Sequence, residues 1–165
     1  MIFSQLADVN SGSSTPTPTT SRFLSQASQI ADPAVDLKVQ WDIQDWISEH
    51  VSHSTSVENT RININTTGKY SFSGAILMNG TNSNYRYTFE ITFLITNLTK
   101  DDVRFQGGYI RSATGANENQ IAYYSIIDLQ EGDYIEVVIN KIGGASGNSA
   151  TIVNGTSLLV EYKHV

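Results

Sequence analysis

From residue 35 onward, the chain is dominated by segments in which apolar and polar residues alternate. Val35–Ile43 shows the pattern first, with an apolar residue at every second position. A period of two places the apolar side chains on one face of a β-strand. Seven further segments are predicted as strands: Arg61–Asn65, Tyr70–Met78, Tyr85–Ile95, Val103–Arg111, Ile121–Ile127, Tyr134–Lys141 and Leu158–Tyr162. Gln44–Val51 fits either a helical turn or an irregular crossing.

Turn-forming residues separate these strands. Asn79-Gly80 and Asn154-Gly155 are Asn-Gly pairs, which tolerate the positive φ of tight hairpins. Thr67-Gly68-Lys69 and Glu131-Gly132-Asp133 are also predicted turns, and Gly143–Asn148 is a glycine-rich loop. No amphipathic helix lies between the strands, which excludes a parallel βαβ fold. The chain is therefore predicted to be all-β, an antiparallel jelly-roll sandwich of about eight strands with an extended N-terminal arm.

Residues 1–34 differ from the rest of the chain. Residues 10–21 (NSGSSTPTPTTS) are small, polar and proline-containing, so they have little apolar surface to offset the entropy lost on ordering. The segment is either a disordered tail or an arm that docks on a neighbouring subunit through apolar side chains. We therefore expect a flexible arm and linker over 1–34 and a jelly-roll domain over 35–165. The candidate docking residues flank the polar stretch and are Ile2, Phe3, Leu6, Phe23 and Leu24.

Two motifs within residues 54–165 carry a resemblance to a known family. One is Gly68–Phe72 (GKYSF), and the other is Leu129–Val137 (LQEGDYIEV). They resemble the G-x-Y-x-F and L-x-x-GD-x-(I/V)-x-(V/L) strands of complement globular heads and tumour-necrosis-factor-like ligands. The resemblance implies a compact homotrimer. It also implies that Gly68 permits a turn, that Tyr70 and Phe72 fill the core, and that Gly132-Asp133 turns the chain before a buried strand.

The chain departs from that family in ways that affect the expected function. Its closing strand, Ser157–Tyr162, lacks the family's F-x-G, and no Gly-X-Y stalk precedes the domain. Met1–Val9 has neither the charge nor the apolar run of a secretory signal. We therefore expect a virion structural protein, either a capsid decoration (cement) protein or a minor capsid protein. Its expected partners are copies of itself and other virion proteins, and its expected location is the virion, assembled in the host cell.

Charge and composition exclude several other classes. Ten Lys and Arg against sixteen Asp and Glu give a net charge of −6, and no basic run is present. Nucleic-acid binding requires a basic surface for the phosphates and is therefore not expected. The chain has no cysteine, so disulfides and thiolate metal sites are excluded. No stretch approaches the roughly 18 apolar residues of a membrane span, so membrane insertion is not expected.

The residues offer no constellation typical of catalysis. No G-x-S-x-G motif occurs, and a cysteine nucleophile is absent. His50 and His53 with Glu49 are the only suggestive cluster, but their spacing matches no closed zinc site. Asp101-Asp102 reads as an acidic loop tip rather than a pair of calcium ligands. The chain is therefore predicted not to be an enzyme and to need no metal or cofactor.

Aromatic residues leave a second function open. Tyr85, Tyr87, Phe89 and Phe93 share one face of one predicted strand. They form either a sugar-stacking platform or, as we favour, a sandwich core and a subunit interface. The alternative function is accordingly a receptor- or carbohydrate-binding head domain of a viral fibre or spike, with a host glycan or receptor as partner.

Overall fold

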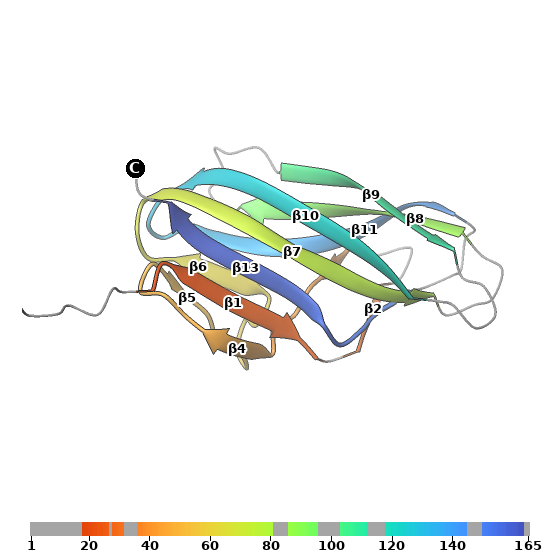
Figure 1. Cartoon of the computed structure of the whole chain (residues 1–165), viewed down its shortest axis with the longest axis horizontal. Coiled ribbons are helices and arrows are strands. Elements are labelled where there is room, and N and C mark those ends of the chain that lie inside the picture. The colour runs from red at the N-terminus through yellow and green to blue at the C-terminus, as the bar shows by residue number, and fades with distance from the viewer. Residues whose placement is uncertain are drawn as a thin grey trace, which may run out of the picture.

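The chain folds as two antiparallel β-sheets packed face to face (Figure 1). The structure is a computed structural model. It describes residues 18–26, 28–31, 36–80, 86–95, 103–111, 118–144 and 150–163. These residues form thirteen strands and no helix.

The first sheet is built around β7 (Gly68–Gly80), the longest strand. β10 pairs along one edge of β7, while β12 and β13 share the other edge. β1 pairs with β13, β4 pairs with β1, and β2 pairs with β12. Figure 1 shows β10, β7, β13, β1 and β4 side by side in that order. The bounds of these strands are β1 (Thr20–Ser25), β2 (Gln29–Ala31), β4 (Ile43–Trp46), β10 (Glu118–Leu129), β12 (Ala150–Ile152) and β13 (Thr156–Lys163).

The second sheet is built around β11 (Tyr134–Gly144). β8 pairs along one edge of β11 and is followed by β9. β6 and β3 pair along the other edge, and β5 follows β6. The bounds of these strands are β3 (Leu37–Lys38), β5 (Val51–Ser52), β6 (Arg61–Ile64), β8 (Arg86–Ile95) and β9 (Val103–Arg111).

The core lies between the sheets, where the inward faces of β7 and β8 meet. The rings of Phe72 on β7 and Phe93 on β8 are 5.6 Å apart, and the ring of Tyr123 on β10 lies 5.5 Å from that of Phe93. Tyr70 and Phe72 are fully buried, which confirms their predicted place in the core. Alternation produces this result because every second residue of a strand points to the same face.

The structure confirms the predicted all-β sandwich, but its described residues form thirteen strands instead of the predicted eight or so. Among the described residues of the predicted strand Val35–Ile43, only Leu37–Lys38 and Ile43, the first residue of β4, pair in a sheet. Val39 and Trp41 are still fully buried, as the alternation requires. Val39 N–H still donates to Val137 O at 2.8 Å, so the segment follows β11 without continuous pairing. Gln44–Val51 contains the end of β4, a turn and the start of β5.

The domain boundary expected after residue 34 requires correction. β1 lies between β13 and β4 within the first sheet, and β2 pairs with β12. Phe23 is fully buried in the core of its own chain rather than in a groove of a neighbouring subunit, and Leu24 belongs to the same strand. Ile2, Phe3 and Leu6 lie outside the described residues.

The structure confirms some of the predicted glycine turns and corrects others. Gly132 and Gly155 both have the positive φ of turn residues, +89° and +100°. The hairpin predicted at Asn154-Gly155 is nevertheless wrong, because β12 and β13 both pair antiparallel with β7 and the chain does not reverse between them. Asp133 Oδ2 accepts a hydrogen bond from Gln130 N–H at 2.8 Å, closing the turn at Gly132. Gly68 begins β7 rather than forming a turn, and a Cβ there would lie 2.5 Å from Tyr162 Cε2. β7 also runs through Asn79-Gly80, so the hairpin predicted there is wrong.

Candidate functional site

The outward face of β10 carries the first candidate interaction surface. Tyr123 and Ile127 point into the core, so their neighbours Tyr124 and Ile126 point outward. Tyr124 is 60% exposed and Ile126 is 51% exposed, which is high for large apolar side chains. Because water contact with such side chains is unfavourable, exposed apolar residues that cluster mark a binding surface.

The adjacent strand β7 presents only small side chains beside them. Tyr124 lies opposite Ser73 in the sheet, Ile126 lies opposite Ser71, and Ala75 follows on the same face. Small residues leave the sheet flat, so another surface can approach closely. We call these five residues the assembly face, namely Ser71, Ser73, Ala75, Tyr124 and Ile126.

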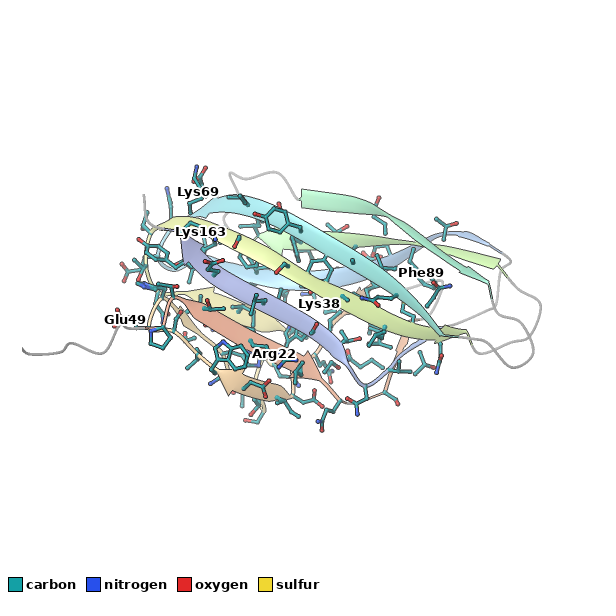
Figure 2. The ribbon with its side chains drawn as sticks, in the orientation of Figure 1. Arg22, Lys38, Glu49, Lys69, Phe89 and Lys163 are labelled. Carbon is teal, nitrogen blue, oxygen red and sulfur yellow. The ribbon has the colours of Figure 1, made fainter. Side chains whose placement is uncertain are left out.

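A second exposed group lies at the far edge of the same sheet, on β4. Trp46 is 44% exposed, and the guanidinium of Arg22 lies 5.5 Å from the centroid of its ring. Arg22 Nη1 also lies 3.0 Å from Asp45 Oδ2. Figure 2 places Arg22 on β1, next to β4 and away from β10. We call Arg22, Asp45 and Trp46 the edge triad.

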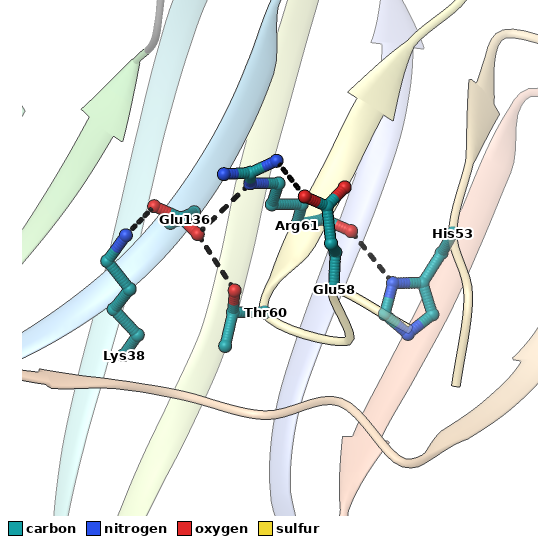
Figure 3. Close-up of polar contacts among 6 residues, drawn as sticks. All are labelled: Lys38, His53, Glu58, Thr60, Arg61 and Glu136. Carbon is teal, nitrogen blue, oxygen red and sulfur yellow. Dashed lines mark hydrogen bonds and ion pairs between the residues drawn. The ribbon is translucent and has the colours of Figure 1, made fainter. Parts of the chain in front are cut away.

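A buried carboxylate joins three elements on the other sheet (Figure 3). Glu136 on β11 is 3% exposed. Its carboxylate accepts hydrogen bonds from Lys38 Nζ at 2.5 Å and Thr60 Oγ1 at 2.8 Å, and Arg61 Nε lies 3.4 Å away. Burial opposes ionisation, but the hydrogen bonds and positive charges outweigh it and lower the pKa of Glu136. These contacts fix the start of β6 and β3 against β11, which is a structural role.

The histidine cluster suggested by the sequence is not assembled. His50 stacks on Tyr162, with ring centroids 4.0 Å apart. The ring nitrogens of His53 face two backbone carbonyls, Arg61 O at 2.8 Å and Trp41 O at 2.7 Å. Both rings therefore make structural contacts of their own. Within the described residues, no group of three or more His, Asp or Glu is placed to hold a metal ion.

The loop between β5 and β6 is tightly held although its tip is exposed. Ser54 Oγ accepts a hydrogen bond from Val57 N–H at 3.1 Å, and Arg61 Nη1 contacts Glu58 Oε1 at 2.5 Å. Glu58 has a φ of +51°, which is unusual for a residue other than glycine. Val57 is 70% exposed at this tip.

In the part of the chain that the structure describes, no helix is long and apolar enough to cross a membrane.

Sequence reasoning found some of these residues and missed others. Tyr124 and Ile126 belong to a strand that was predicted, but their exposure depends on which side of the sheet is covered. Of the predicted aromatic face, Phe89 and Phe93 are fully buried in the core, as favoured. The edge triad was missed because Arg22 and Trp46 are brought together only by the pairing of β1 with β4. No local pattern in the sequence could have indicated it.

Comparison with known proteins gives a likeness in fold alone. No family model matches the chain, and no curated protein matches it. The structure of murine APRIL superposes with a TM-score of 0.57 at 15% identity, covering 87% of this chain and 99% of that one. The structure of Eiger TNF from S. frugiperda gives a TM-score of 0.55 at 11% identity, covering 90% and 95%. The chain therefore has the jelly-roll fold of the tumour-necrosis-factor-like proteins.

Proposed function

We propose that this chain is a non-catalytic structural module that assembles as a homotrimer through the assembly face. The observation that carries the proposal is the exposure of Tyr124 and Ile126, 60% and 51%, beside the small residues of β7. Covering apolar area stabilises an assembly by roughly 25 cal/mol per Å² before the costs of association. The resemblance to tumour-necrosis-factor-like ligands implies that the assembly has three copies.

The chemistry of the assembly face suits a contact between copies. Tyrosine combines a large apolar ring with a hydroxyl that can form a hydrogen bond, which is why it is enriched at interfaces. Ser73 supplies a hydroxyl group opposite the ring of Tyr124, and the small size of Ser71 and Ser73 allows a neighbouring ring to lie close to the sheet. In a chain without cysteines, association of this kind replaces the stability that disulfides give other small domains.

In this proposal the trimer is a structural component of a virion that decorates its capsid. Ile2, Phe3 and Leu6 then dock on a neighbouring subunit, and the polar residues 10–17 span the distance to β1. The support is the sequence pattern of an apolar segment followed by a proline-containing polar linker. Phe23 and Leu24 are no longer candidate docking residues, because they belong to β1.

The assembly is tested by measuring the mass of the full chain with light scattering after gel filtration. We expect a mass three times the monomer's 18.1 kDa, and a shift to monomer in Tyr124→Asp and Ile126→Asp variants. Val57→Asp is the matched control, because Val57 is 70% exposed and lies in the loop between β5 and β6. A monomeric full chain, or a trimer unchanged by both β10 substitutions, would contradict the proposed interface.

The virion role needs a separate experiment. An antibody against the chain, used in immunogold labelling of virus particles purified from its source, should label the particle surface. Labelling should be reduced in particles that carry the Phe3→Asp variant of the chain. Particles that lack the chain altogether would contradict the virion role and leave the assembly intact.

A further inference from the structure

The edge triad is produced by an irregularity in the pairing of β1 with β4. Arg22 lies opposite Trp46, but the next residue, Phe23, lies opposite Gln44. One step along β1 therefore matches two steps along β4, and Asp45 is the extra residue of a β-bulge. A bulge changes the direction of a side chain that regular alternation would send to the opposite face. This explains why Asp45 and Trp46, although adjacent in a strand, both contact Arg22.

The bulge is fixed on both sides. Toward the start of β4, Asp42 Oδ1 accepts a hydrogen bond from Gln26 N–H at 2.8 Å. Beyond the end of β4, Ser48 N–H donates to Ser21 Oγ at 2.8 Å, in a buried contact. Phe23, the residue next to Arg22, is fully buried in the core. The edge triad is therefore held in place before any ligand arrives, and preorganisation of this kind lowers the cost of binding.

We infer that Arg22, Asp45 and Trp46 form a binding site for a neutral saccharide. A pyranose ring has an apolar C–H face and a rim of hydroxyl groups. Arg22 lies over one face of the Trp46 indole, so the other face of this exposed ring is the apolar surface for the C–H face. Carboxylate oxygens accept hydrogen bonds from hydroxyl groups, and guanidinium N–H groups donate to hydroxyl and ring oxygens. The edge triad supplies all three functions within one small surface.

The charges of the edge triad favour a neutral ligand over an ionic one. Arg22 and Asp45 neutralise each other at 3.0 Å, so the site presents no net charge to attract a phosphate, a sulfate or a cation. Their hydrogen-bonding atoms still remain available, since the side chains of Arg22 and Asp45 are 41% and 31% exposed. A hydroxyl-rich neutral molecule can use these atoms without displacing a competing ion.

The saccharide site is separate from the assembly face. One row of paired residues crosses the first sheet from β10 to β4. Tyr124 on β10 lies opposite Ser73 on β7, and Ser73 lies opposite Leu159 on β13. Leu159 in turn lies opposite Arg22 on β1, which lies opposite Trp46 on β4. Trp46 is therefore four strands from Tyr124, roughly 19 Å at the usual strand spacing. Assembly through β10 and β7 leaves the edge of β4 open, so each subunit can bind a saccharide independently.

The two tryptophans allow a direct test on the full chain. Trp41 is fully buried in the core and serves as an internal reference, while Trp46 is 44% exposed and reports on the site. The probes are lactose, cellobiose, maltose and diacetylchitobiose, each titrated to about 100 mM while the two indole N–H resonances are recorded. We expect at least one disaccharide to shift the Trp46 resonance in a saturable way without shifting that of Trp41.

Variants then connect the binding to the edge triad. By ligand-observed NMR, Trp46→Ala and Asp45→Asn should each weaken binding of that disaccharide by about tenfold or more. Tyr124→Ala, the matched aromatic control on the assembly face, should bind unchanged whether or not it still assembles. Thermal unfolding confirms that each variant is folded. The inference is overturned if no disaccharide moves the Trp46 resonance, or if a folded Trp46→Ala variant binds with unchanged affinity.

Discussion

Lys38 Nζ lies 2.5 Å from Glu136 Oε2, an ion pair between residues 98 positions apart in the chain. The two partners differ sharply in environment, because the side chain of Glu136 is 4% exposed and that of Lys38 is 47% exposed. The carboxylate is therefore the component whose loss is costly. It accepts hydrogen bonds from Lys38 and Thr60 and also lies beside Arg61.

Glu136→Gln should destabilise the fold, because a neutral amide cannot accept from Lys38 and Thr60 while facing Arg61 as well. Hydrogen bonds to a buried charged group contribute about 1.5–3 kcal/mol each, so we expect a loss of about 2 kcal/mol or more in the free energy of unfolding. Urea denaturation measures it. Lys38→Met is the control and should cost less than Glu136→Gln, because Lys38 is half exposed. If the two variants lost the same free energy of unfolding, Glu136 would not be the residue that organises the network.

The same carboxylate should make stability depend on pH. Its folded-state pKa is lowered, whereas in the unfolded chain it titrates near 4.5. The stabilisation is thus fully present above pH 4.5 and is lost as the pH falls through the folded-state pKa. Urea denaturation between neutral pH and pH 3 should show this decline, and the decline should be smaller in Glu136→Gln. If Glu136→Gln lost stability with falling pH as steeply as the native chain, other acidic residues would be responsible for the decline.

The sequence was sufficient to predict the strands whose buried positions are apolar. Tyr70 and Phe72 alternate with polar residues, so their burial followed from period two alone. β1 was missed because two of its three buried positions hold serine. Ser21 and Ser25 are fully buried and are satisfied by contacts with Ser48 and Gln29. A strand with hydroxyl groups in the core has the polar composition of a linker.

The candidate sites depend on contacts that no local pattern encodes. The bulge at Asp45 exists only because residues near 22 pair with residues near 46. The network around Glu136 likewise joins residues 38, 60 and 61 to a strand far along the chain. Gly68 illustrates the same limit, since its constraint comes from the ring of Tyr162 and not from a turn. Long-range pairing therefore had to be known before these roles could be assigned.

Two glycines of β7 should differ in their tolerance of alanine. A Cβ at Gly74 would lie 2.1 Å from the backbone oxygen of Ser157, and a Cβ at Gly68 would lie 2.5 Å from the side chain of Tyr162. Backbone in a paired strand cannot move away cheaply, whereas a ring can rotate. Gly74→Ala should therefore cost about 3 kcal/mol or prevent folding, and Gly68→Ala should cost about 1–2 kcal/mol. Thermal or urea unfolding tests the order, and adding Tyr162→Leu should recover stability only in the Gly68 variant.

His53 should act as a structural clamp for the loop between β5 and β6. Its ring nitrogens face Arg61 O at 2.8 Å and Trp41 O at 2.7 Å, and its ring packs 5.1 Å from that of Phe23. His53→Leu keeps an apolar contact with Phe23 but leaves both carbonyls without the imidazole, at an expected cost of about 1–3 kcal/mol. Amide hydrogen exchange should accelerate at residues 54–60 and stay unchanged in β7 and β13. Unchanged exchange in the loop would mean that Ser54 and the Glu58–Arg61 pair hold it without His53.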